Sequence, residues 1–320
     1  MITINRIDCP DILKQGKNPK SKGELETIDA LKFFSDQNNH TSTYRKTGTT
    51  TVGYKIYSDD SVRKVLLNMF NGKCAYCESK ITSIYNGDIE HFRPKGEIKE
   101  ATPTKPGYYW LAAEWENLLF ACPFCNQTNT HTIIANGILK ETVLGKLHQF
   151  PLVSEQYRLK YTHGQIYFSD RNAYQQAFDL EETERLLLNP CKDLNIENYF
   201  KYEDSGVIIV NSDLTEQRNI LRAEKSIQVY ALNRLALVQA RREKIIQIKA
   251  QIKRTEESII NYNRYAKQSD EEKIWFEGIM RKEIKILKRY KNINQEYSGL
   301  AKYIIRKYFE EIYFIRLGMY

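Results

Sequence analysis

The stretch "ENLLFACPFCN", residues 116–126, ends in two cysteines separated by two residues. An earlier pair stands in "CAYC", residues 74–77, and 44 residues separate the two pairs. Four thiolates suit a tetrahedral zinc ion, and a site with four protein ligands is closed and structural. The spacing therefore predicts a structural Zn²⁺ site, with two unrelated pairs or a redox motif as the alternatives. The predicted ligands are Cys74, Cys77, Cys122 and Cys125.

Composition is typical of a soluble globular protein, because 42% of the 320 residues are hydrophobic and 28% are charged. No run of about 18 apolar residues is present, so no membrane span is expected. The first residues are too polar for a signal peptide, which favours the cytoplasm. There, C-x-x-C pairs indicate metal ligands rather than disulfides. The net charge of +8 suits a polyanionic partner without requiring one.

Four regions follow from the distribution of apolar residues and chain breakers. We expect a mixed α/β region, a core around the cysteines, a second mixed region packed on that core, and a helical region. Their bounds are 1–71, 72–137, 138–213 and 214–320. The last region has Ile on one face and Lys or Arg on the others. The pattern predicts an α+β fold in a mostly helical chain, with a single large domain as the alternative.

The segment "GDIEHFRPKG", residues 87–96, lies between the cysteine pairs and places Glu90 next to His91. A histidine beside a carboxylate can act as a general base while the acid binds a hard metal ion. On a strand the two side chains would point to opposite faces, so a shared site needs a bend. Pro94 and Gly96 make a bend plausible. The alternative is a surface histidine beside a surface acid.

The order of these parts resembles the HNH nuclease family in its zinc-bearing form. The likeness covers "CAYC", "IEHFRP" and "ENLLFACPFCN", about 55 residues in all. The resemblance implies a ββα-metal core, in which two strands and a helix surround one catalytic Mg²⁺ or Mn²⁺. It also implies a metal-dependent endonuclease that hydrolyses phosphodiester bonds.

The resemblance assigns a role to each matching residue. His91 corresponds to the general base, and Asn117 to the residue that orients the loop bearing it. Glu90 and Asn126 correspond to ligands of the catalytic metal, although the family more often has Asp at the first position. Asp88 is a further candidate ligand.

Other residues near the motif are open to two interpretations. The family often has a Lys where this chain has Asn129, and His131 nearby is a candidate for a phosphate or metal contact. Arg93, Lys95 and Lys99 are candidates for phosphate contact, and the alternative for them is a solvated loop.

A closer resemblance extends from about residue 60 to about residue 245. It is to the HNH nuclease subunit of Septu-type antiphage defence systems, which also occurs with some retrons. The matching stretches are "CAYCES", "IEHFRPK", "GYYWLAAEWENLLFACPFCN", "LLLNPCKD" and "ALNRLALVQARR". The resemblance implies an ABC-type, SMC-related ATPase as partner in a hetero-oligomeric complex, and an effector that degrades nucleic acid. We expect DNA to be the substrate.

Two other functions stay open at this point. One is a non-catalytic zinc module that binds nucleic acid or a protein partner. The other is an HNH nuclease that cleaves RNA such as tRNA, because a metal and a histidine act on a phosphate common to both polymers. The C-terminal helices are candidates for partner or nucleic-acid binding. For the basic residues from Arg241 to Arg254, we favour a solvated helix face.

Overall fold

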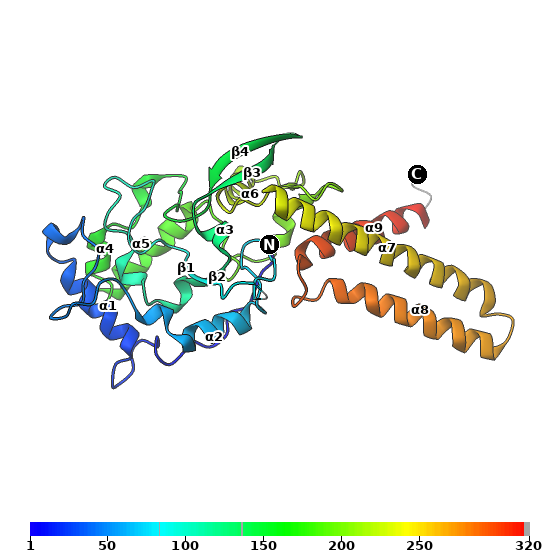
Figure 1. Ribbon diagram of the computed structural model, residues 1–320, viewed down its shortest axis with the longest axis horizontal. Coiled ribbons are helices and arrows are strands. Elements are labelled where there is room, and N and C mark those ends of the chain that lie inside the picture. Colours follow the sequence, from blue (N-terminus) through cyan, green and yellow to red (C-terminus); the bar gives the residue numbers. More distant parts are fainter. Residues whose placement is uncertain (83, 136, 317–320) are drawn as a thin grey trace.

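Helices dominate the chain, which the computed structural model describes over residues 1–82, 84–135 and 137–316. The body contains α1 (Lys22–Phe33), α2 (Asp60–Met69), α3 (Pro123–Asn126), α4 (Tyr161–Gln165), α5 (Arg171–Glu184) and α6 (Gln217–Val229). Three longer helices follow, namely α7 (Leu235–Tyr265), α8 (Asp270–Tyr290) and α9 (Ser298–Arg316). α7 and α8 form an antiparallel hairpin that projects from the body, and α9 packs at its base (Figure 1). No helix among the described residues is long and apolar enough to cross a membrane.

Strands form three separate antiparallel pairs in the described chain. They are β1 (Asp88–His91) with β2 (Leu118–Ala121), β3 (Asn129–Ala135) with β4 (Ile138–Leu144), and β5 (Phe200–Tyr202) with β6 (Ile208–Val210). In the first pair Glu90 stands opposite Leu119 and His91 opposite Leu118. The mixture of helices and small antiparallel sheets confirms the expected α+β class.

α2 delivers the first cysteine pair to the core. Asp59 caps the helix by accepting a hydrogen bond from the Ser61 backbone N–H, as its sequence position predicts. Leu66 is among the side chains that α2 buries, and the helix contacts β2. The chain then turns through Asn71 and Gly72, both with positive φ, which ends the helix just before Cys74.

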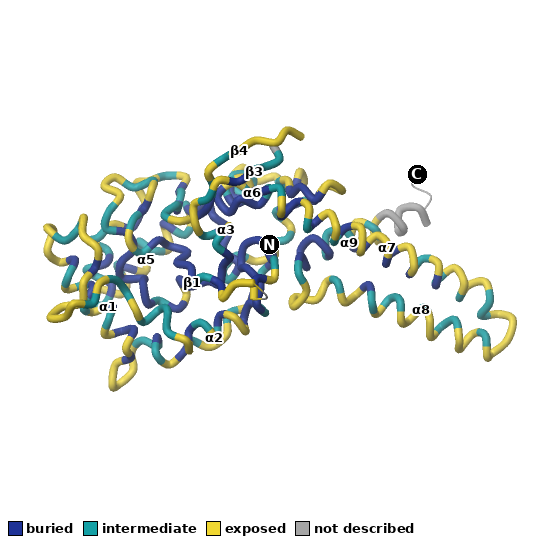
Figure 2. Tube along the Cα trace, viewed as in Figure 1, coloured by how far each residue is buried: buried dark blue, intermediate teal, exposed yellow. Residues whose placement is uncertain are grey.

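One hydrophobic core runs through the body, from Met1 to Leu300. Figure 2 shows this buried chain inside the body, whereas the α7–α8 hairpin is largely exposed. The aromatic segment that precedes β2 lies in this core, so its rings pack inside the body and are not exposed to stack on bases. Its four large side chains are at most 4% exposed: Tyr108, Tyr109, Trp110 and Trp115.

Three sequence expectations need correction. α3 is a single turn, so the helix expected after the second cysteine pair is short, and β3 begins at Asn129. The boundary expected at residue 137 lies between β3 and β4, which pair along their whole length. The helical pattern after residue 214 is interrupted between α6 and α7, where Ala231 has a positive φ.

Candidate functional site

The four cysteines form a buried cluster. Their Sγ atoms all lie within 4.8 Å of one another, and those of Cys77 and Cys122 are 3.9 Å apart. Among the described residues, this is the one group of at least three His, Cys, Asp or Glu side chains whose ligand atoms lie close enough together to hold a metal ion. The clustering predicted from the two C-x-x-C pairs is confirmed, and four thiol groups at this spacing suit a tetrahedral ion such as zinc.

Backbone hydrogen bonds fix both cysteine turns. In the first turn the Glu78 N–H donates to the Cys74 carbonyl over 3.0 Å, and Glu78 has a φ of 64°. In the second turn the Cys125 N–H donates to the Cys122 carbonyl over 3.1 Å. The Ala75 N–H donates to the Phe120 carbonyl over 2.8 Å and so joins the first turn to β2. The cluster therefore ties α2, β2 and α3 together.

Arg234, at the turn between α6 and α7, lies against the cysteine cluster. Its guanidinium donates to Cys125 Sγ over 3.4 Å and lies 3.9 Å from Cys122 Sγ. Burial alone would lower the pKa of Arg234, but the neighbouring thiolates outweigh burial and raise it. The cation offsets the negative charge of a four-thiolate site. Sequence analysis missed this residue, because its distance of 109 residues from Cys125 gives no local signal.

A pocket of about 750 Å³ opens beside β1. It brings together Asp88, Glu90, His91 and Asn126, which the sequence singled out separately, and it adds Lys95. His131 does not reach this pocket. It lies on β3 and lines a different cavity with Phe124 and Arg234, so the expectation that it contributes to the same metal site is wrong. The short α3 is the reason, because the chain turns away into β3 after one turn.

His91 ends β1 and is 5% exposed. Its Nε2 lies 2.9 Å from the Ala112 carbonyl oxygen. Because a carbonyl can only accept, Nε2 carries the proton and Nδ1 is the unprotonated nitrogen that can accept. Lys95 Nζ is 3.3 Å from that Nδ1, and the Tyr57 ring packs against the imidazole. Burial, followed by the charge of Lys95, holds the pKa of His91 well below its ordinary value, so the ring is neutral at pH 7.

Asn117 uses its side-chain amide to clamp the loop that follows His91. Its Oδ1 accepts from the Arg93 backbone N–H over 2.7 Å, and its Nδ2 donates to the carbonyls of Arg93 (3.0 Å) and Leu111 (3.1 Å). The Phe92 N–H also donates to the Asn117 carbonyl over 2.9 Å. Asn117 is 4% exposed, so these bonds are shielded from water.

Glu90 forms an ion pair with a lysine that sequence analysis missed. Lys146 is fully buried, and its Nζ lies 2.7 Å from Glu90 Oε1 and 2.9 Å from the His91 carbonyl oxygen. Burial raises the pKa of Glu90, while Lys146 opposes that effect. Gly145 makes this approach possible, because a Cβ there would lie 1.9 Å from the Gln127 carbonyl oxygen. In the sequence, the pair Gly145–Lys146 is the feature that could have indicated this ion pair, and a glycine followed by a lysine is only a weak indication.

Asp88 faces the same pocket with its carboxylate held by three donors. Oδ2 accepts from Asn126 Nδ2 over 2.9 Å and from Gln127 Nε2 over 3.0 Å, and Oδ1 accepts from the Tyr85 hydroxyl over 2.5 Å. Asp88 and Asn126 are therefore in direct contact, one from β1 and the other from α3. Carboxylate and amide oxygens are ligands that Mg²⁺ and Mn²⁺ prefer.

The three candidates for phosphate contact lie in different environments in the structure. Lys95 lines the pocket, and Lys99 is exposed outside it. Arg93 is 2% exposed and pairs with Glu181 at 2.7 Å and Glu182 at 2.6 Å. The expectation that Arg93 contacts phosphate is therefore wrong, because its guanidinium is occupied by two carboxylates from α5 inside the body.

Comparison with known proteins identifies relatives from one system. The chain is 34% identical to Septu protein PtuB of Bacillus mycoides (strain KBAB4) over 220 residues, which are 68% of this chain and 61% of that protein. A second Septu protein PtuB, of Bacillus thuringiensis, is 34% identical over 94 residues, 28% of the chain and 32% of that protein. The alignments thus span less than two thirds of either relative.

Septu protein PtuA of Bacillus mycoides (strain KBAB4) is 26% identical over 186 residues, 56% of the chain and 20% of that protein. No family model matches the chain, and no solved structure matches it at a significant level. The chain is therefore a homologue of Septu protein PtuB, which confirms the resemblance to Septu proteins.

Proposed function

We propose that the protein is a metal-dependent HNH endonuclease that hydrolyses phosphodiester bonds of DNA. The observation that carries the proposal is the setting of His91. Its Nε2–H is committed to the Ala112 carbonyl, and its unprotonated Nδ1, which accepts from Lys95 Nζ over 3.3 Å, belongs to the pocket that also holds Asp88, Glu90 and Asn126. This reaction requires a general base and ligands for a divalent ion, and the pocket offers a neutral imidazole next to oxygen ligands.

The oxygen atoms in the pocket fit a divalent ion of the Mg²⁺ or Mn²⁺ type. Glu90 Oε1 is buried and lies 2.7 Å from Lys146 Nζ, and the carboxylate has further lone pairs that can coordinate an ion. Rotation of the Asn126 amide would present an oxygen in place of the nitrogen that now contacts Asp88. We therefore propose that Asp88, Glu90 and Asn126 hold the ion. When bound, such an ion stabilises the charge that develops on the phosphate and the leaving oxygen.

The protein's own groups then have distinct tasks. His91 Nδ1 removes a proton from the attacking water. General-base catalysis of this kind typically raises the rate of reaction about 10²–10⁴-fold. Lys95 Nζ, which donates to that nitrogen over 3.3 Å, moves from it to the phosphate and supplies positive charge there, which leaves the nitrogen open to the water. Asn117 keeps the loop after the base in position through its three side-chain hydrogen bonds. One base in one pocket makes one cut, so a monomer nicks a single strand.

The homology supports a place for this nuclease in a Septu antiphage defence system. We propose a hetero-oligomeric complex in the cytoplasm with a PtuA-like, ABC/SMC-type ATPase that controls cleavage. The four cysteines hold a structural Zn²⁺ that keeps α2, β2 and α3 together, and this ion takes no part in the reaction.

A cleavage assay tests the proposal. The purified chain, alone and with a Septu PtuA protein, is incubated with supercoiled plasmid and with tRNA, in Mg²⁺, Mn²⁺ or EDTA. We expect nicked plasmid in either metal and none in EDTA. Cleavage of tRNA with intact plasmid would assign the pocket to RNA instead. Binding of nucleic acid without cleavage, in every metal and with PtuA present, would favour the non-catalytic zinc module.

A further inference from the structure

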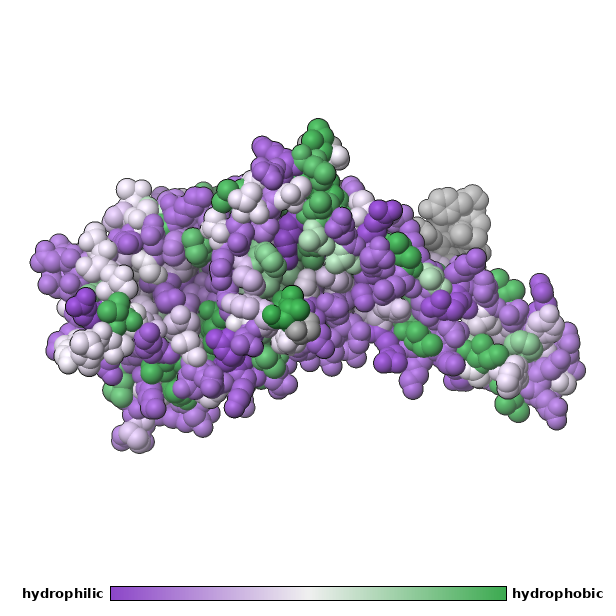
Figure 3. All heavy atoms as spheres, in the orientation of Figure 1, coloured by the Kyte–Doolittle hydropathy of each residue, from purple (hydrophilic) through white to green (hydrophobic). Residues whose placement is uncertain are grey.

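Most of the protein's net charge lies on the α7–α8 hairpin. Residues 235–291 contain fifteen Lys and Arg against eight Asp and Glu, a net charge of +7 in a chain whose total is +8. The hairpin projects from the body, and its visible surface is mainly hydrophilic (Figures 1 and 3). Such a concentration of one sign on one element produces a local field that attracts a polyanion.

Charge is also segregated along α8. Its first turn is acidic, with Asp270, Glu271 and Glu272, whereas its last three turns are basic. Four exposed basic side chains stand there, and we call them the α8 basic face: Lys282, Lys285, Lys288 and Arg289. At 100° per residue the four fall within about 120° of arc, roughly opposite Leu287. Leu287 is buried against α7 and α9 in a small second core, so the basic face points outward.

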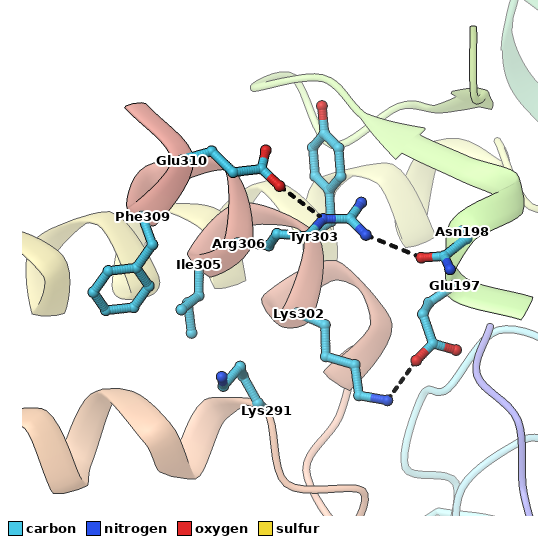
Figure 4. A pocket seen from close by; sticks show the side chains of 9 residues that line it. All are labelled: Glu197, Asn198, Lys291, Lys302, Tyr303, Ile305, Arg306, Phe309 and Glu310. Atoms are coloured by element: carbon cyan, nitrogen blue, oxygen red, sulfur yellow. Dashed lines mark hydrogen bonds and ion pairs between the residues drawn. The ribbon is translucent and has the colours of Figure 1, made fainter. Parts of the chain in front are cut away.

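Several other basic residues of the C-terminal region already have partners. On α7, Arg241 is buried and donates to the Leu232 carbonyl, and Lys249 pairs with Asp204 at 2.6 Å. Around the pocket at α9, Lys302 pairs with Glu197 and Arg306 with Asn198 (Figure 4). The α8 basic face, in contrast, forms no ion pair or hydrogen bond through its side chains within the described chain.

Helix stability alone does not explain the α8 basic face. Lys288 and Arg289 lie in the last turn, where the helix dipole favours cations. Lys282 and Lys285 lie earlier, beyond the reach of that effect. Lys285 and Arg289, four residues apart, repel each other, as do Lys282 and Lys285 at a spacing of three. A bound polyanion would remove this repulsion.

We propose that the α8 basic face binds the phosphate backbone of duplex DNA, at a site separate from the catalytic pocket. The inference rests on the proposed function for the class of substrate. Four cations on an exposed helix face can contact successive phosphates without reading bases, so the binding is independent of sequence. The hairpin thereby retains DNA while the β1 pocket cuts it.

Fluorescence anisotropy with a labelled 30-base-pair duplex tests this proposal, between about 50 and 200 mM NaCl. All proteins are the full chain and carry His91→Ala, which prevents cutting. The test variant is K282Q/K285Q/R289Q. The matched control is K22Q/K32Q/K46Q, which removes the same charge from exposed residues on and after α1, at the other end of the molecule. Circular dichroism verifies the helix content of both.

We expect the test variant to bind at least about tenfold more weakly, with a log–log salt slope smaller by about 3, because three phosphate contacts are lost. The control should change the affinity less than about threefold. Equal affinities and slopes for the test variant and the control would overturn the proposal, as would a lack of duplex binding by the parent protein.

Two further outcomes separate this proposal from the proposed function. Binding that depends on the α8 basic face, together with an intact plasmid in the cleavage assay, would support the face and contradict the nuclease. Polyglutamate that binds as tightly as the duplex, with the same loss in the test variant, would assign the face to an acidic protein and overturn the proposal.

Discussion

The cysteine cluster and the pocket beside β1 are neighbours built on the same strands, yet their polar groups are used in opposite ways. The four cysteines are buried and face one another, and Arg234 closes the cluster from outside. In the pocket, His91 and Glu90 are also buried, but the unprotonated Nδ1 of the histidine and the Glu90 carboxylate line a cavity that a ligand can enter. A closed set of ligands stabilises a fold, whereas an open set can bind and act on something else.

The difference indicates a division of labour. Buried polar groups that lack full hydrogen bonding cost stability, and that cost must be offset elsewhere in the fold. The cysteine cluster lies next to the pocket and fixes the strand and the one-turn helix that carry Asp88 and Asn126. Variants of the cluster should therefore lower stability first, and variants of the pocket should lower activity with a small effect on stability.

The largest effect is expected from Cys74→Ser. Loss of one thiolate opens a four-ligand site, so we expect loss of the bound zinc and a stability decrease of at least about 4 kcal/mol, about 10 °C in Tm. Metal content by mass spectrometry and thermal unfolding measure both. Cys191→Ser is the control, because that half-buried thiol lies outside the cluster. Full zinc content in the Cys74 variant would contradict a four-cysteine site.

Arg93→Met comes next and tests a buried charge that has no role in the pocket. The change leaves Glu181 and Glu182 without their cation, which should cost about 3–5 kcal/mol. Chemical denaturation at pH 7 measures the change. If Arg93 instead contacts DNA, the variant would keep wild-type stability and lose affinity for the duplex.

The same variant carries a pH dependence. Burial alone would raise the pKa of Glu182, but Arg93 and Arg185 outweigh burial and lower it strongly. A depressed carboxyl pKa contributes stability above the unfolded value of about 4.3, and that contribution is lost as the pH falls below it. The gap in stability between wild type and the Met variant should therefore narrow below about pH 4. If the difference in unfolding free energy between wild type and the Met variant stayed constant from pH 7 to pH 3, the ion pair with Glu182 would not be the source of the stability that Arg93 provides.

Asn117→Ala should have a smaller effect on stability and a clear effect on activity. Three buried side-chain hydrogen bonds disappear, which should cost about 2–4 kcal/mol. The loop after His91 loses its clamp, and a displaced base typically costs about 10²-fold in rate. Nicking rates at saturating metal, below the Tm of the variant, measure the second effect. An unchanged rate would remove Asn117 from the positioning role.

Local sequence order was sufficient to anticipate part of this molecule. The spacing of the cysteines predicted their cluster. Contacts between distant residues were not accessible in the same way. Lys146 reaches the His91 carbonyl from 55 residues away, and Arg93 meets Glu181 from 88 residues away. Both depend on how loops fold back over the strands, which no periodic pattern encodes.

The short α3 is a related case. "NQTNTHTII" after Cys125 is rich in Thr and Ile, which favour strands, yet the resemblance to HNH nucleases led us to expect a helix there. The local propensity was the better guide, and it also explains why His131 lies outside the pocket. For this segment the residues themselves carried more information than the family pattern.

The most direct test of the account is metal-dependent nicking of supercoiled plasmid by His91→Ala, compared with wild type and His148→Ala. His148 lines the same pocket, and its carbonyl accepts from the Lys99 N–H over 2.9 Å, a backbone contact that the alanine variant keeps. The account predicts a rate about 10²–10⁴-fold lower for His91→Ala, with unchanged zinc content and Tm, and less than about a threefold change for His148→Ala. Wild-type nicking by the His91 variant would contradict the assignment of this pocket as the active site.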